Sequence, residues 1–177
     1  IEKILVPGLS IQQFSYLLKL SSNFPQQIDI ALGCHPYFLK ALSKKDSEDL
    51  KKALFELGFE HKDKIVAVGE CGLDGNLELS MAYQEKILGW HIDLACAIEK
   101  PLVLHHQKSH NQLIRLLKSK AYELGGVIHA FSGSHELANT YINMGFKLGV
   151  GGTITYPRVV KTIATIKNVA LEHLLIE

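Results

Sequence analysis

Short apolar, β-branched runs alternate with longer amphipathic stretches along the whole chain, and this alternation limits the possible folds more than any other feature. The apolar runs are nearly continuous, as in strands that are buried on both faces of a sheet. The longer stretches carry apolar residues at helical spacing, for example at Leu50, Ala53, Leu54 and Leu57. Strands that alternate with helices predict a parallel sheet whose strands are joined by helical crossovers.

The pattern predicts seven strands, at residues 3–7, 28–33, 65–68, 101–104, 126–129, 146–150 and 174–176. Helices are predicted between them, at about 10–22, 47–58, 80–99, 112–124, 134–144 and 157–168. We expect Gly58 to end the second helix and Pro157 to open the last one.

Seven parallel strands suit either a doubly wound open sheet or a (β/α)₈ barrel that lacks one strand. The first turn between a strand and a helix, at residues 7–10, lacks the GxGxxG pattern of dinucleotide-binding folds. No repeat or linker divides residues 1–177, so we expect a single domain.

Composition excludes several classes of protein. The chain is 47% hydrophobic and 21% charged, with a formal net charge of +1, which does not favour a large cationic surface that holds duplex nucleic acid. No run of about 18 apolar residues and no signal-peptide pattern is present, so neither membrane insertion nor secretion is predicted. Three cysteines without a CxxC pair favour reduced thiols and a cytoplasmic location, and no protein partner is predicted.

Potential metal ligands lie at the ends of four successive predicted strands. In a parallel α/β fold the carboxyl ends of the strands meet at one edge, and His35, Glu70, His105 and His129 lie there. A carboxylate and neutral imidazoles suit a divalent cation such as zinc, manganese or magnesium. A carboxylate that points into a barrel is also costly unless a positive charge compensates it. The sequence therefore predicts a metal site built from Glu70, His105 and His129.

Other residues near the strand ends have alternative interpretations. His35 contacts a substrate phosphate, orients a metal-bound water, or is a histidine of the turn before Pro36. Arg158 follows a glycine-rich segment where barrels often bind phosphate, and it also fits an ordinary helix start. Cys34 and Cys71 lie beside the predicted site, but the spacing shows no base that would activate a thiol. Asp74 is predicted to be a turn residue.

Four ordered runs give the chain a specific resemblance. The runs ALGCHP (31–36), VGECGLD (68–74), PLVLH (101–105) and GVIHAFSGS (126–134) resemble the TatD family of metal-dependent hydrolases and deoxyribonucleases in order and spacing. The run GVGGTITYPR (149–158) is similar to the YjjV-like subgroup of that family. The resemblance covers essentially the whole chain.

The resemblance implies an amidohydrolase-like TIM (β/α)₈ barrel with one or two divalent metal ions (zinc, magnesium or manganese), here incomplete with about seven strands. It implies that Glu70 is the bridging ligand and a catalytic residue, and that His105 and His129 are imidazole ligands of one metal. The family's His-x-His pair on the first strand and its Asp on the last strand have no counterpart in residues 1–177. We therefore expect this chain to be part of a longer polypeptide.

The activity that the resemblance implies is metal-dependent hydrolysis of phosphodiester bonds, as in a deoxyribonuclease that acts on short or single-stranded DNA. Contact between substrate and His35 or Arg158 is part of this prediction. His106 and Gln107 occupy positions where relatives commonly carry Ser and Arg, and this difference removes a fixed positive charge. Two alternatives stay open: a metal-dependent hydrolase of amide or ester bonds, and a catalytically inactive barrel that serves as a binding scaffold.

Overall fold

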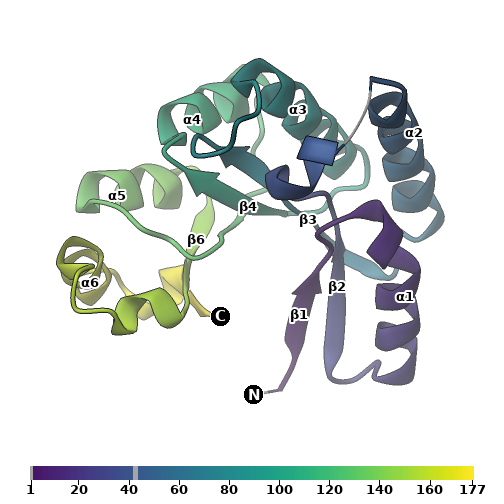
Figure 1. Cartoon of the computed structure of the whole chain (residues 1–177). Coiled ribbons are helices and arrows are strands. Elements are labelled where there is room, and N and C mark those ends of the chain that lie inside the picture. Colours follow the sequence, from purple (N-terminus) through teal and green to yellow (C-terminus); the bar gives the residue numbers. More distant parts are fainter. Residues whose placement is uncertain (1, 42–43) are drawn as a thin grey trace.

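Seven parallel strands form one continuous sheet in which every strand pairs with its neighbours in the sequence, in the order β1 to β7. The computed structural model describes residues 2–41 and 44–177. The strands are β1 (Ile4–Pro7), β2 (Ile28–Leu32), β3 (Ile65–Asp74), β4 (Leu102–Gln107), β5 (Gly126–Ile128), β6 (Phe146–Val150) and β7 (Leu174–Ile176). The sheet curls into the larger part of a barrel, with β1 and β7 as its two edges (Figure 1).

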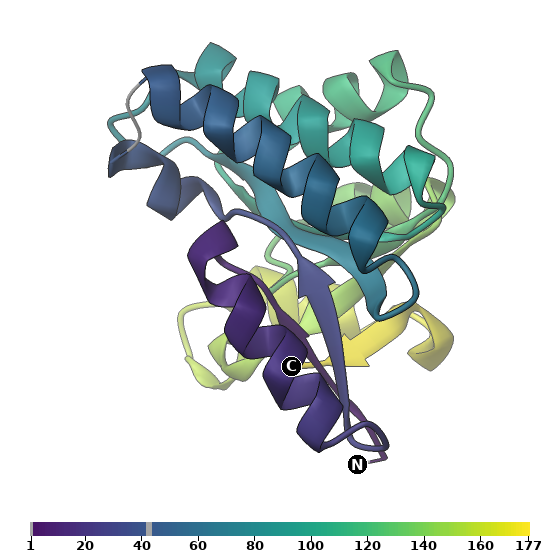
Figure 2. The same cartoon turned by 90° about the vertical axis from the view of Figure 1, so that its right-hand side faces the viewer.

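Helices cover the convex face of the sheet (Figures 1 and 2). The α-helices are α1 (Phe14–Asn23), α2 (Lys44–Glu60), α3 (Met81–Ala97), α4 (His110–Ser119), α5 (His135–Asn143) and α6 (Val160–Lys167). Short 3₁₀ helices lie at η1 (Ile11–Gln13), η2 (Pro36–Ala41), η3 (Gly152–Thr155) and η4 (Leu171–His173). None of the helices in the described ranges has the length and apolar character needed to cross a membrane.

The two faces of the sheet carry different side chains because successive strand residues point in opposite directions. In β2, Ile30 and Leu32 belong to the main core between the sheet and its helices. Between them, Ala31 faces the concave side, where it forms a small cluster with Ala67, Val103 and Val127. This division of large and small residues explains why the apolar strands have helices on one side only and curl around a narrow interior. The predicted TIM-barrel architecture, incomplete with seven strands, is confirmed.

Several predicted helix boundaries are wrong: α4 covers His110–Ser119 and not 112–124, and neither Gly58 nor Pro157 marks a helix end. Helix α2 continues past Gly58 to Glu60, and a β-carbon at Gly58 would collide with the Leu94 side chain of α3. This glycine therefore allows two helices to approach closely and does not end one. The segment at Pro157 is not helical, because η3 ends at Thr155 and α6 begins only at Val160.

Strands β3 and β4 are longer than their apolar runs predict, and the extension positions the chemistry. Residues Cys71 to Asp74 pair with Leu104 to Gln107, so the polar ends of both strands remain in the sheet. The register shifts between Gly69 and Cys71, which places Glu70 at an irregularity of the β-bulge type. Such bulges re-aim side chains at barrel rims. Glu70 and His105 are therefore held by strands and not by loops.

Candidate metal centre

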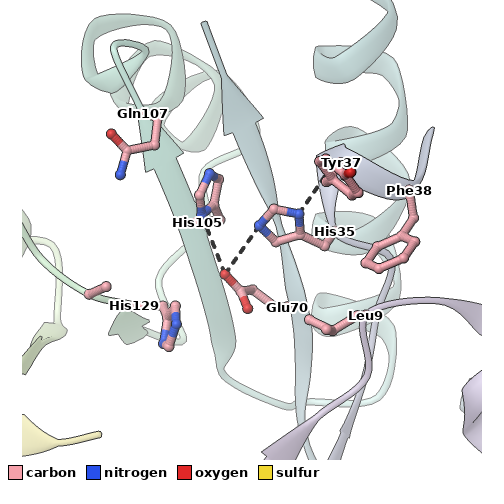
Figure 3. A pocket seen from close by; sticks show the side chains of 9 residues that line it. Leu9, His35, Tyr37, Phe38, Glu70, His105, Gln107 and His129 are labelled. Atoms are coloured by element: carbon pink, nitrogen blue, oxygen red, sulfur yellow. Dashed lines mark hydrogen bonds and ion pairs between the residues drawn. The ribbon is translucent and has the colours of Figure 1, made fainter. Parts of the chain in front are cut away.

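A cavity of about 360 Å³ lies at the carboxyl ends of the strands. Its polar lining consists of His35, Glu70, His105, Gln107 and His129, and its apolar lining includes Leu9, Tyr37 and Phe38 (Figure 3). Among the described residues that line this cavity, none is a lysine or an arginine. The four predicted strand-end residues therefore share one pocket, and no fixed positive charge lies in the described part of its wall.

Glu70 lies at the centre of this pocket and is only 4% exposed. One carboxylate oxygen, Oε1, is 3.5 Å from Nε2 of His35 and 3.4 Å from Nδ1 of His105. The pKa of the Glu70 carboxyl is lower than its ordinary value. Burial alone would raise this pKa, but the hydrogen bond with His105 and the charges that the surrounding histidines can carry outweigh the effect of burial. Glu70 is therefore a buried anion that faces imidazole nitrogens, as a metal-ligating carboxylate would.

His105 bridges two carboxylates. Its Nδ1 faces Glu70, while its Nε2 is 3.4 Å from Oδ2 of Asp74 at the end of β3. The other oxygen of Asp74 accepts a hydrogen bond from the backbone N–H of Asn76 at 2.8 Å, as the predicted turn residue should. A histidine that donates one ring N–H to a carboxylate presents its second nitrogen as a metal ligand. Asp74 thus has a second contact, with His105, that the sequence does not predict.

His129 has a carboxylate partner of its own. Its Nδ1 is 2.9 Å from Oε1 of Glu177, and the hydrogen bond from this pair raises the pKa of His129 despite its partial burial. The second oxygen of Glu177 accepts the backbone N–H of Ala130 at 2.7 Å. Because Nδ1 of His129 contacts Glu177, Nε2 is the ring nitrogen that His129 can offer to a cation.

His35 has a different hydrogen-bond pattern. Its Nδ1 accepts the backbone N–H of Tyr37 at 3.1 Å, so in the neutral ring the proton lies on Nε2. Burial, and then the nearby His105, lower the pKa of His35, which favours the neutral ring. Donor atoms of His35, Glu70 and His105 lie within 4.8 Å of one another, as in a metal-binding cluster, and this group contains His35 where the sequence predicted His129. The tautomer, however, makes Nε2 of His35 a hydrogen-bond donor toward Glu70 (Figure 3).

The remaining candidates lie outside the cavity lining or are chemically inert. The guanidinium of Arg158 is exposed and lies 5.5 Å from the ring centroid of Tyr156. His106 is buried and packs against the ring of Tyr141. Burial raises the pKa of Cys34 to about 12 and that of Cys71 well above its ordinary value, so neither thiol is activated as a nucleophile.

Comparison with known proteins gives the chain a family. The model of the TatD related DNase family matches residues 1–177. The uncharacterized metal-dependent hydrolase YjjV of Escherichia coli is 38% identical over 177 residues, which cover 99% of this chain and 66% of that protein. The 3'-5' ssDNA/RNA exonuclease TatD of Edwardsiella piscicida is 28% identical, over 98% of this chain and 66% of that protein.

Solved structures agree with the sequence comparisons. The crystal structure of Escherichia coli YjjV superimposes with a TM-score of 0.88 at 35% identity, over 99% of this chain and 66% of that one. A TatD family hydrolase from Entamoeba histolytica, at 24% identity and a TM-score of 0.80, shares the fold. The chain thus spans about two thirds of the length of these bacterial relatives. Because the family model matches every residue and the resemblance to YjjV extends over 99% of the chain, this chain belongs to the TatD related DNase family.

Proposed function

We propose that this chain is a divalent-metal-dependent hydrolase of phosphodiester bonds that acts on short or single-stranded DNA, with residues 1–177 as one domain. The observation that carries the proposal is the convergence of a buried carboxylate, Glu70, with His105 and His129 in one cavity. The family of DNases to which the chain belongs and the similarity to the Edwardsiella ssDNA/RNA exonuclease support nucleic acid as the substrate.

The donor types of the pocket suit a divalent cation, although among the described residues the donor atoms within 4.8 Å of one another belong to His35, Glu70 and His105 and not to His129. Glu70 would offer an Oε atom, His105 its Nδ1 and His129 its Nε2, and a carboxylate behind each histidine would hold the ring in the required tautomer. When bound, such a cation supplies positive charge that acidifies a water molecule and stabilises the anionic transition state of phosphodiester hydrolysis. One or two ions of zinc, magnesium or manganese suit these ligands.

The other residues of the pocket have roles that follow from their hydrogen bonds. The Nδ1 of His35 accepts the N–H of Tyr37, and its Nε2–H faces Glu70 at 3.5 Å; this N–H would have to turn away from Glu70 to donate to a substrate phosphate. Glu70 would fix the cation on the strand β3, where the sheet holds its position. Arg158, exposed beside Tyr156, would have to approach from outside the cavity, so contact between Arg158 and phosphate remains a prediction.

The experiment is hydrolysis of a 5'-labelled single-stranded oligonucleotide by the chain, with added Mg²⁺, Mn²⁺ or Zn²⁺ and with an excess of chelator. We expect cleavage that requires the metal and that is lost in Glu70→Gln, because the amide weakens ligation while it keeps the shape of the side chain. Circular dichroism should show that this variant is folded. Chelator-resistant cleavage, full activity of Glu70→Gln, or hydrolysis of a carboxylic ester with no cleavage of any phosphodiester would contradict the proposal.

A further inference from the structure

Two aromatic side chains form one side of the cavity and remain exposed to solvent. Tyr37 and Phe38 lie in η2 (Pro36–Ala41), directly after His35, and are 60% and 40% exposed. Their ring centroids are 5.4 Å apart at an angle of 81°, an edge-to-face arrangement that fixes the two rings relative to each other. Both rings line the same cavity as Glu70 (Figure 3). Solvent-exposed aromatic surface at the mouth of a polar pocket is typical of ligand binding.

The backbone of this aromatic pair is fixed relative to the proposed metal ligands. The N–H of Tyr37 donates to Nδ1 of His35 at 3.1 Å, and the N–H of Phe38 donates to the carbonyl oxygen of His35 at 3.0 Å. His35 in turn contacts Glu70 and lies 4.2 Å, between ring centroids, from His105. Any group that stacks on Tyr37 or Phe38 is therefore held at a set position relative to Glu70.

The charge of the pocket indicates how it would hold a nucleic acid. Its described lining offers no lysine or arginine to a phosphate, and Gln107, on the end of β4, presents an uncharged amide. The whole chain has a formal net charge of only +1. At the described lining, counterion release at cationic side chains is therefore a weak source of affinity. Stacking of bases on aromatic rings is the other general source, and it requires unpaired bases.

We propose that Tyr37 and Phe38 form a stacking platform for an unpaired nucleobase next to the phosphodiester bond that is cleaved. This inference rests on the proposed function and adds to it the feature that the pocket recognises, a base that is free of its complementary strand. A base inside a duplex is covered by its neighbours on both faces, and a terminal base of a duplex is still held by its complementary strand, so the platform selects single-stranded ends over paired ones. The amide of Gln107, on the same cavity wall as the metal ligands, can hydrogen-bond the edge of such a base.

The test compares two single-stranded oligonucleotides that differ only in whether the terminal nucleotide carries its base or is abasic. The double variant Tyr37→Ala/Phe38→Ala should raise the KM for the strand with the base about tenfold, with little change in kcat, since stacking contributes binding energy of this order. The KM for the abasic strand should not change. Phe38→Tyr, which keeps a ring at that position, should retain affinity within a factor of about two.

Tyr16→Ala is the matched control, because Tyr16 is 65% exposed on α1 and does not line the cavity.

Binding of both strands is also measured by fluorescence anisotropy in the presence of chelator, because this measurement does not depend on turnover. Equal affinity of the native chain for both strands, or an equal loss for both in the double variant, would overturn the platform even if hydrolysis is normal. Selective binding of the strand with the base, without cleavage of either strand, would support the platform and contradict the proposed function. Absence of both binding and cleavage would overturn both.

Discussion

Glu177 holds His129 through a contact of 2.9 Å between Oε1 and the ring Nδ1, although the two residues are 48 positions apart in the chain. The same carboxylate accepts the backbone N–H of Ala130 at 2.7 Å. Ala130 has a positive φ of 45°, an uncommon conformation for a residue other than glycine. The carboxylate thus fixes both the imidazole and the backbone that follows it.

Glu177→Gln should weaken metal binding about 10- to 100-fold, the usual effect of removing the partner of a ligating histidine. The neutral amide turns an NH₂ group toward one of the two donors, so either His129 or Ala130 loses its acceptor. Calorimetric titration of metal-free protein with Mn²⁺ or Zn²⁺ measures the change. Glu172→Gln, at an exposed carboxylate outside the cavity lining, is the control and should have no effect. Unchanged affinity in Glu177→Gln would mean that this contact does not support a ligand.

Gly149→Ala should have the same effect on metal affinity without altering any polar group. A β-carbon at Gly149 would collide with the carboxylate of Glu177 and displace it from His129. Because both substitutions disrupt one contact, the double variant Gly149→Ala/Glu177→Gln should lose little more affinity than either single variant. Gly152→Ala, where a β-carbon meets nothing within 4 Å, is the matched control. Fully additive losses in the double variant would show that the two residues act independently.

His91 gives the stability of the chain a dependence on pH. It is fully buried in α3, its Nε2 accepts the N–H of Cys34 at 3.1 Å, and its Nδ1 lies 2.9 Å from the carbonyl oxygen of Ile87. Burial lowers its pKa to about 4, although the hydrogen bond with Ile87 opposes the shift. The imidazole of an unfolded chain binds a proton below about pH 6.5.

Between pH 6.5 and about 4 the unfolded state therefore binds a proton at His91 that the native state does not. The free energy of unfolding should fall as the pH falls through this window, with His91 contributing about 1.4 kcal/mol per pH unit, and this contribution should level off below it. His91→Gln, whose amide can keep one donor and one acceptor, should remove that contribution. Urea unfolding of both proteins at several pH values measures the difference in slope. Equal slopes would show that His91 does not titrate in this way.

The three cysteines should differ sharply in reactivity. Cys34 and Cys71 are buried and Cys96 is exposed, and burial raises the pKa of Cys34 to about 12. Because the thiolate is the reactive form, iodoacetamide at pH 8 should label one cysteine in the native chain, at position 96, and all three after denaturation. Peptide mass spectrometry identifies the modified positions. Rapid labelling of Cys34 in the native chain would contradict the inert role that burial gives it.

The order and type of the main elements follow from the sequence because the parallel sheet buries continuous apolar runs. The carboxyl ends of β3 and β4 could not be predicted in this way. The segment 70–74 is not an apolar run, and its pairing with β4 is what keeps it in the sheet. The predicted start of the last helix at Pro157 is also wrong, because proline suits a turn as well as the first turn of a helix, and α6 begins at Val160.

The sequence placed His35, Glu70, His105 and His129 at one edge of the sheet, and the structure brings all four to one cavity. The carboxylate partners could not be found in the same way. Asp74 contacts His105 only because the strands run on in register, and Glu177 reaches His129 across β6. The sequence pattern predicts which residues follow the end of each strand. The hydrogen-bond partners of those residues depend on the curvature of the whole sheet and are not predicted by the pattern.

The sequential strand order has a consequence for biosynthesis. As the ribosome releases the chain, each new strand can join the sheet beside the one made just before it. Glu70 and His105 can meet once β4 has emerged, but His129 lacks its carboxylate until residue 177 has been added. In a nascent chain, the proposed ligand His129 would thus gain its carboxylate partner only after β7 has docked.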